Sequence, residues 1–294
     1  MTAVSENLFS QALDIIKLGA TAFAADSVAF VLGFLVRRTV DRNVNRVFLG
    51  LKRNSFSSII LPATARMFPG TTSTFRNVGV PVLTLGVIKA YAKVSETLSS
   101  AGVSNDKLST YTSDTVPPER TSDNLFILGF SKTNKFAERI YESHDVPLKF
   151  HEHGVIDSRT GNVLYTATVK GGNVQTDYGL LTVIANPFGL GSRAFLFGGC
   201  QSLGVSAAAL ALDVRNIPST NFGDSRIRFV SVIFCALGLN IVNVYLAAAM
   251  RKTSNFQVVI TGTVMNDEFV ACKFIERRRF KRAKPSGAGY TLVR

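Results

Sequence analysis

Apolar runs of strand length alternate with stretches of helical spacing along much of the chain. The strand-like runs, rich in Val, Ile, Leu and Phe, cover 58–61, 124–128, 180–185, 194–197 and 256–264, and a further one is expected over 268–274. Helical spacing of apolar residues covers 87–98, begins again near Asn134 and returns in the alanine-rich stretch 205–212. Strands that alternate with helices predict an α/β fold whose sheet is mostly parallel and flanked by helices.

Two stretches between these runs carry turn and loop signals. Residues 155–169 read as a hairpin, because two strand-like runs flank the turn-rich pentad Asp157–Gly161. Residues 103–122 are polar and contain Pro117 and Pro118. This second stretch therefore predicts a loop.

A longer apolar run, Leu18–Val36, predicts a hydrophobic helix near the N-terminus. Its only charged residue is Asp26, and its length is close to the roughly 20 residues that span a bilayer. Basic residues crowd positions 37–53, whereas only Lys17 precedes the run. If the helix spans, this bias places the following domain in the cytoplasm. We consider three interpretations: a spanning anchor, an interfacial or docking helix, and a signal peptide.

A second run, Phe229–Met250, contains no charged residue and is flanked by two basic residues on each side. If it also spanned, the basic C-terminal tail would lie across the membrane from residues 37–53. That arrangement conflicts with the positive-inside bias. We therefore predict that this run lies in the folded core, with packing against lipid or a partner as the alternative.

These features divide the chain into three parts. Residues 1–53 form the hydrophobic helix and basic stretch, 54–276 the α/β domain, and 277–294 a basic tail. The expected location is the membrane, with the α/β domain in the cytoplasm, and the alternative is a cytoplasmic protein.

Charge changes the picture of the partners. Lys and Arg number 33 against 20 Asp and Glu, which gives a net charge of +13. Such a balance favours nucleic acid, phosphorylated ligands or an acidic membrane surface. Nucleic-acid binding rests on this charge alone, because no nucleic-acid-binding motif is present. The three cysteines, Cys200, Cys235 and Cys272, are too widely spaced for a disulfide framework or a zinc motif.

The candidate ligand loop follows the apolar run that ends at Phe197. It combines glycines with a predicted helix start, and its candidate ligand residues are Gly198, Gly199, Gln201, Ser202, Gly204 and Ser206. Glycines let a ligand approach the backbone, and free amides at a helix N-terminus attract anions. Val205 stands where a Walker A motif needs lysine, so a P-loop NTPase is not indicated. The alternative is a tight strand-to-helix turn without a ligand.

A companion loop follows the run 124–128. Its candidate ligand residues are Gly129, Ser131, Lys132, Thr133 and Asn134. Three of them suit a helix N-cap, and Lys132 suits a phosphate. In a parallel sheet both loops would lie at the carboxyl edge, where open α/β folds bind ligands. Ordinary helix capping is the alternative interpretation.

Between the two loops lie Asp177-Tyr-Gly-Leu180 and Asn186-Pro-Phe188. Together with the Gly129 to Asn134 spacing and the later strand-Gly-Gly-loop-helix, these motifs resemble a Rossmann-like domain of archaeal S-layer-type proteins and bacterial proteins of unknown function. The resemblance covers about residues 57–275. It departs from the pattern at Phe130-Ser131, where Gly-Pro is usual. It implies a Rossmann-like fold and no particular catalytic residues, and we add Asp177 to the candidate ligand set.

Catalytic and metal signals are sparse. His151 and His153 would share one face of a strand, with Asp157 as the nearest third ligand, but an exposed strand explains them equally well. No nucleophile motif is present, and we lean against an enzyme.

The leading hypothesis is a membrane-associated binding or sensing module for an anionic, nucleotide-like ligand held at the glycine loops. One alternative is a structural or assembly protein whose Rossmann-like domain holds no ligand and packs against partners or copies of itself. The other is a basic nucleic-acid-binding protein. No particular cofactor is implied.

Overall fold

The computed structural model describes residues 46, 49–52, 55–63, 83–130, 133–151, 154–212, 255–265 and 268–280. The chain divides into two units, Met1–Asn43 and Val44–Arg294, and every described residue belongs to the second. The predicted hydrophobic helix over 18–36 and the uncharged run 229–250 lie outside the described residues. Within the described ranges, no helix is long and apolar enough to cross a membrane.

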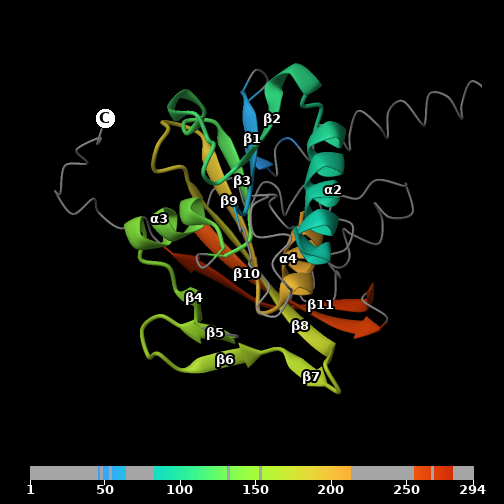
Figure 1. The fold of residues 1–294 in the computed structure, drawn as a ribbon. Coiled ribbons are helices and arrows are strands. Elements are labelled where there is room, and N and C mark those ends of the chain that lie inside the picture. Colours follow the sequence, from blue (N-terminus) through green and yellow to red (C-terminus); the bar gives the residue numbers. More distant parts are fainter. Residues whose placement is uncertain are drawn as a thin grey trace, which may run out of the picture. The chain divides into compact units, whose positions relative to one another are not determined.

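Strands outnumber helices in the described part of the Val44–Arg294 unit (Figure 1). In chain order the elements are β1 (Ser57–Leu61), α2 (Leu85–Ser100), β2 (Leu108–Thr112), β3 (Asn124–Leu128), α3 (Lys135–Ser143), β4 (Leu148–His151), β5 (Gly154–Asp157), β6 (Val163–Thr166), β7 (Thr168–Lys170), β8 (Asn173–Ala185), β9 (Arg193–Gly199), α4 (Ser202–Leu210), β10 (Asn255–Met265) and β11 (Glu268–Phe280). Two short 3₁₀ helices cover Asn105–Lys107 and Pro118–Arg120.

The main sheet is mixed, so the prediction of a mostly parallel, Rossmann-like sheet flanked by helices is wrong. Its strand order is β11-β10-β8-β9-β3-β1-β2, with β7 paired to β8. Among the described strands, β2, β1, β3 and β9 pair in parallel, whereas β8 pairs antiparallel with β7, β9 and β10, and β10 with β11. The prediction failed because a short apolar run indicates a strand without indicating its direction or its partner.

Tight turns account for much of the antiparallel pairing. Gly171 and Gly172 have φ angles of +58° and +81° and join β7 to β8 in a two-residue turn. Positive φ at both positions matches the turn that best fits the twist of a hairpin. The predicted hairpin around Asp157–Gly161 is confirmed as β5 and β6. With β4 they form a separate three-stranded sheet.

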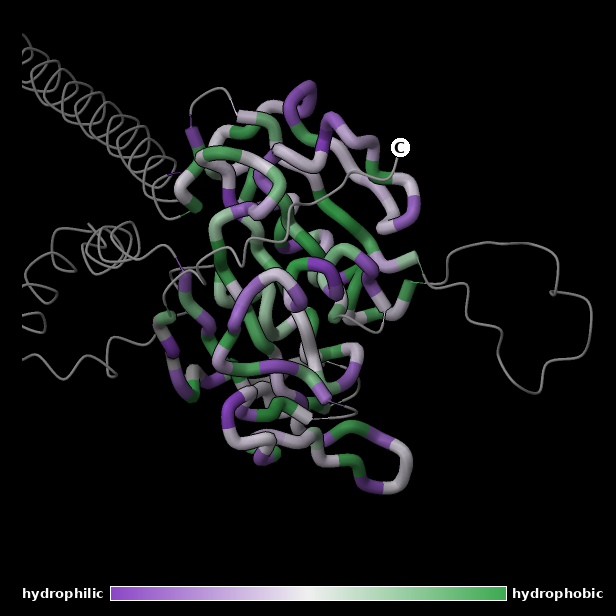
Figure 2. The backbone as a smooth tube through the Cα atoms, turned by 90° about the vertical axis from the view of Figure 1, so that its left-hand side faces the viewer, coloured by the Kyte–Doolittle hydropathy of each residue, from purple (hydrophilic) through white to green (hydrophobic). Residues whose placement is uncertain are grey.

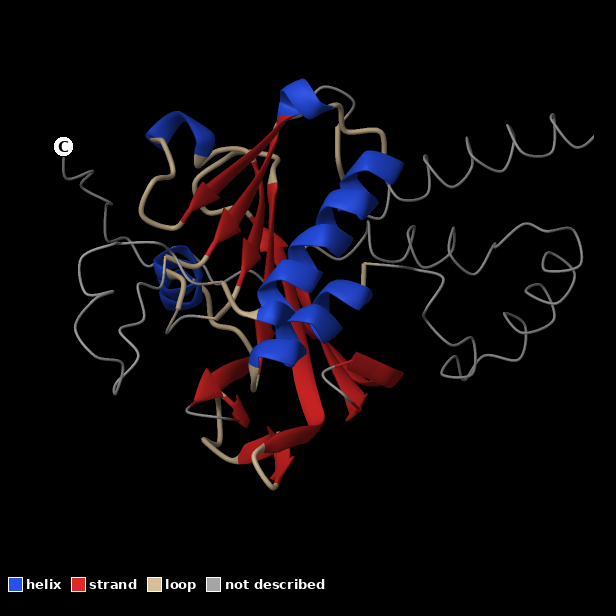
Figure 3. Cartoon of the chain, turned by 45° about the vertical axis from the view of Figure 1, so that its right-hand side comes forward, coloured by secondary structure: helices blue, strands red, loops and turns tan. Residues whose placement is uncertain are grey.

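The two faces of the main sheet are covered by different helices (Figure 3). Side chains alternate along β3, so that Phe126 and Leu128 pack with residues of α2 and α4, whereas Leu125 and Ile127 pack with α3. Figure 2 shows hydrophobic residues gathered along the interior of this unit. Strands β1, β3 and β9 of the parallel half are therefore buried on both faces, as is usual for near-continuous apolar runs.

Two elements differ from their sequence predictions. The stretch 103–122, predicted as a loop, contains β2, whose sequence Leu-Ser-Thr-Tyr-Thr forms the partly exposed edge of the main sheet. Its polar composition concealed it, because an edge strand need not be apolar. At the other edge, β11 extends to Phe280, so the first residues of the predicted basic tail belong to a strand.

The end of the basic stretch 37–53 packs against the same unit. Leu49 and Leu51 are buried in the core beside α2. Arg46 Nη2 donates a hydrogen bond to the carbonyl oxygen of Gly102, just past the end of α2, at 3.3 Å. In the same segment Gly50 is partly exposed and Lys52 is exposed.

Candidate functional site

The N-terminus of α4 is already occupied by a carboxylate of the chain itself. Asp177 on β8 is fully buried. Its Oδ1 accepts hydrogen bonds from the N–H groups of Tyr178 at 2.8 Å and Gln201 at 3.0 Å, and its Oδ2 accepts one from the N–H of Gly204. This side chain thus fills the place that the sequence suggested for an external anion.

Two opposing effects act on the pKa of Asp177. Burial raises the pKa, because the charged form loses its water, whereas the three N–H donors lower it. Burial is the larger effect, so the pKa lies above its ordinary value.

The glycines of this loop allow strands and helix to approach closely. A Cβ at Gly204 would lie 2.7 Å from Gly199 Cα and would also collide with the carbonyl oxygen of Tyr178. A Cβ at Gly199 would lie 2.5 Å from the carbonyl carbon of Gly204, and one at Gly198 would strike the Phe150 ring. Gly199 and Gly204 are therefore explained by packing between β8, β9 and the start of α4, and Gly198 by packing against β4.

In the companion loop, too, a side chain of the loop itself accepts hydrogen bonds at the start of the following helix. Asn134 is fully buried, and its Oδ1 accepts hydrogen bonds from the N–H groups of Phe136 at 3.0 Å and Ala137 at 3.4 Å. Its Nδ2 donates to the carbonyl oxygens of Leu128 at 3.0 Å and Ile60 at 3.3 Å. Asn134 therefore caps α3, as predicted, and ties the ends of β3 and β1 together.

The remaining predicted ligand residues divide between the same two loops. Gly129 follows β3 with φ +89°, and the hydroxyl of Thr133 donates to the carbonyl oxygen of Phe130 at 3.2 Å. Gln201 is the N-cap residue of α4, and Ser202 and Ser206 lie within that helix. Ser131 and Lys132 lie outside the described residues.

The two loops do lie at one edge, because β3 and β9 are parallel neighbours and each loop follows a carboxyl end. At that edge, however, both helix N-termini carry an internal acceptor, Asn134 for α3 and Asp177 for α4. An anion bound at these loops stays a prediction.

The metal suggestion gains no support from the described residues. His151 is exposed at the end of β4, and His153 lies outside them. Asp157 instead forms an ion pair with Arg278 at 2.6 Å, and this contact lowers the pKa of the carboxyl. No group of three His, Cys, Asp or Glu side chains suited to a metal ion occurs within the described ranges.

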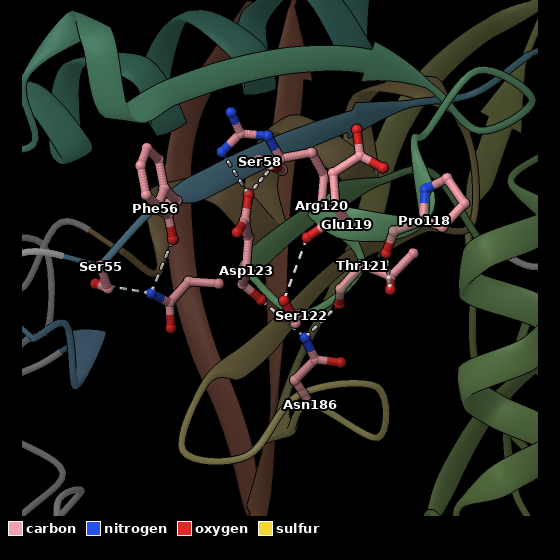
Figure 4. Close-up of polar contacts among 11 residues, drawn as sticks. Ser55, Phe56, Ser58, Pro118, Glu119, Arg120, Thr121, Ser122, Asp123 and Asn186 are labelled. Atoms are coloured by element: carbon pink, nitrogen blue, oxygen red, sulfur yellow. Dashed lines mark hydrogen bonds and ion pairs between the residues drawn. The ribbon is translucent and has the colours of Figure 1, made fainter.

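A polar network that the sequence analysis missed lies at the opposite edge of the parallel strands, where β1 and β3 begin (Figure 4). Ser58 Oγ donates to Asp123 Oδ2 at 2.8 Å, and Arg120 lies 3.7 Å from the same carboxylate. The Arg120 guanidinium also sits 4.7 Å from the centre of the Phe56 ring. One carboxylate oxygen of Asp123, Oδ2, therefore contacts both Ser58 and Arg120.

Asn186 and Asn124 extend this network. Asn186 Nδ2 donates to the carbonyl oxygens of Thr121 and Asp123, both at 2.8 Å (Figure 4). Asn124 Oδ1 accepts from the backbone N–H of Arg193 at 3.1 Å. The Asn186-Pro-Phe motif was the available signal for this region, and its asparagine serves to hold the loop before β3.

No family model, curated protein or solved structure matches the chain. Membership of the family suggested by the sequence motifs therefore stays a prediction, whereas the Rossmann-like sheet that the resemblance implied is wrong for the described strands.

Proposed function

We propose that the chain is a membrane-associated docking module whose helix α2 lies on the lipid surface. The observation that carries this proposal is an exposed apolar stripe on α2. Leu85 is 47% exposed, Ile88 49% and Tyr91 36%. Residues three apart follow one another along one side of a helix, so the three side chains form a continuous surface.

The stripe is distinct from the side of α2 that packs in the core. The buried positions of α2 include Val87, Ala90, Val94 and Leu98. Leu85, Ile88 and Tyr91 belong to none of the described clusters of buried apolar residues. Single exposed apolar residues need no explanation, but a stripe of them is a typical binding surface.

The charges around the stripe favour lipid as its partner. Lys89 and Lys93 lie on the same helix, with Lys93 paired to Glu96 at 3.0 Å, and the whole chain carries a net charge of +13. A helix with apolar residues on one side and lysines beside them is typical of the membrane interface. Anionic headgroups attract such basic residues by about 1 kcal/mol each.

The proposal retains membrane association from the leading sequence hypothesis and assigns the glycine loops to the fold. In this respect it adopts the alternative of a domain whose loops hold no ligand. Asp177 and Asn134 supply the acceptors that a bound anion would otherwise provide.

Tryptophan fluorescence tests the proposal directly, because the chain contains no tryptophan. We expect the emission of an Ile88→Trp variant to shift to shorter wavelength when the full chain is reconstituted in vesicles containing phosphatidylglycerol. Lipids brominated on the acyl chain should quench that emission. A Val163→Trp variant is the matched control, because Val163 is 59% exposed on β6.

The result that overturns the proposal is emission from Ile88→Trp that remains water-like, and unquenched, in vesicles. A shift that grows with protein concentration without lipid would also overturn it and would assign the stripe to a second copy of the chain.

A further inference from the structure

Arg193, the first residue of β9, carries a guanidinium group that is partly buried and has no counter-charge among the described residues. Its Nη1 is shielded from solvent and has no hydrogen-bond partner. No carboxylate within the described ranges forms an ion pair with it, and burial alone lowers the pKa of this side chain. Buried charges in proteins are normally paired, because an isolated one loses its hydration without compensation.

Asp123, an acidic residue next to a hydrogen-bond partner of the Arg193 backbone, makes its contacts with other residues. Asp123 precedes Asn124, whose side chain accepts the backbone N–H of Arg193. The Asp123 carboxylate, however, accepts from Ser58 and pairs with Arg120. Among the described residues, Arg193 is therefore left without a paired carboxylate.

A second cation lies where the segments 50–52 and 191–193 pass each other. A Cβ on Gly50 would lie 2.9 Å from Arg193 Nε, and a Cβ on Gly191 would lie 2.9 Å from Lys52 Nζ. Gly50 therefore packs against the Arg193 side chain, and Gly191 packs against the Lys52 side chain. Gly50 and Gly191 have positive φ angles, +63° and +78°. Glycine adopts such angles more readily than other residues, so the backbone at this crossing requires glycine at both positions.

We propose that Arg193 and Lys52 bind a phosphoryl group at this crossing. A guanidinium offers a planar fork of donors that matches phosphate oxygens, and a lysine adds a mobile second charge. The N–H groups of Gly191 and Ser192 donate to no described acceptor and are further donors in the same loop. The group can come from free phosphate or from the headgroup of an acidic lipid. The site shares no residue with the α2 stripe, so it stands if the docking proposal fails.

Thermal unfolding of the full chain tests the site with two probes, inorganic phosphate and soluble dihexanoyl phosphatidate, against chloride at equal ionic strength. A ligand that binds only the folded state raises the melting temperature. We expect a saturable rise with either or both probes, and the effective probe identifies the source. Arg193→Gln should weaken binding at least tenfold and Lys52→Gln several-fold. Arg159→Gln, in the exposed turn after β5, is the matched control and should bind like the wild type.

The chloride measurement separates binding from a structural role. Without phosphate, Arg193→Gln should melt no lower than the wild type, because the change removes an unpaired charge. If that variant does not fold, Lys52→Gln decides, since Lys52 is exposed. The proposal is overturned if neither probe raises the wild-type melting temperature above chloride. It is also overturned if a folded Arg193→Gln binds as tightly as wild type, or if Lys52→Gln does.

Discussion

The carboxylate of Asp177 on β8 accepts a hydrogen bond from the main-chain N–H of Gly204 in the first turn of α4. This contact joins an antiparallel strand to the helix that follows β9. It also replaces the external anion for which a glycine-rich strand-to-helix loop is usually suited. The two residues also pack closely, because a Cβ atom on Gly204 would lie only 3.0 Å from Asp177 Oδ1.

Asp177 should make the stability of the protein depend on pH in an unusual direction. Because burial raises its folded-state pKa, the folded chain holds this proton to higher pH than the unfolded chain, whose carboxyl titrates near about 3.9. The wild type should therefore lose free energy of unfolding as pH rises from about 3.9 through the raised pKa, and no further above it.

Urea unfolding between pH 3.5 and pH 7 measures this effect against Asp177→Asn, which cannot titrate. The stability of the wild type relative to that variant should fall across the window. If the stability of the wild type relative to Asp177→Asn instead grew with pH, the three N–H donors would lower the Asp177 pKa more than burial raises it. Our assignment of burial as the larger effect would then be wrong.

Gly204→Ala should lower the free energy of unfolding, although alanine normally stabilises a helix relative to glycine by about 1 kcal/mol. The added methyl group would meet Gly199 Cα at 2.7 Å, and such overpacking costs about 1–3 kcal/mol. Denaturant unfolding measures the change, with Ser202→Ala in the same helix as the control that should change little. A Gly204→Ala variant as stable as the wild type would contradict the packing explanation.

The local elements could largely be predicted from the sequence. The apolar run 58–61 lies in β1, the run 124–128 is β3, and the helical spacing 87–98 lies in α2. The periodicity of apolar residues does not indicate which strands pair with one another or in which direction they run. β8 runs antiparallel between β9 and β10, and its polar first half alternates in exposure and shows no apolar run. The direction of such a strand depends on partners far away in sequence.

The candidate site shows the same limit. The sequence indicated Asn134 and the glycines beside two helix starts, but their residue types fit a cap as well as a ligand. It named Asp177 as a candidate ligand residue without indicating that its side chain meets the start of α4. Only the tertiary contacts decide which acceptor each amide meets. Arg193 could not be found at all, because its distinguishing property is a missing counter-charge, and the absence of a neighbour has no signature in a sequence.

Asn134→Ala should destabilise the protein by about 3 kcal/mol or more, since it removes an N-cap and leaves buried groups on β1 and β3 without partners. Asn134→Asp keeps the acceptor for α3 but sets a carboxylate against the carbonyl oxygens of Leu128 and Ile60. Chemical unfolding should therefore show a large loss for this variant at pH 7 as well. If Asn134→Asp were as stable as wild type, capping alone would explain the residue. Thr133→Ala, one position earlier, is the control.

Cys200 and Cys272 should differ sharply in reactivity. Cys200 follows β9, is buried, and its thiol has its pKa raised to about 12 by burial and by the Asp177 carboxylate. Cys272 on β11 is exposed, although partial burial of its thiol also raises the pKa. Since the thiolate is the reactive form, reaction at pH 8 requires both deprotonation and access.

In a Cys235→Ser background, we expect a thiol reagent to modify Cys272 in the native protein and Cys200 only after denaturant is added, as counted by mass spectrometry. Native modification of Cys200 at the rate of Cys272 would mean that the junction between β9 and α4 opens readily, which the contacts of Asp177 oppose.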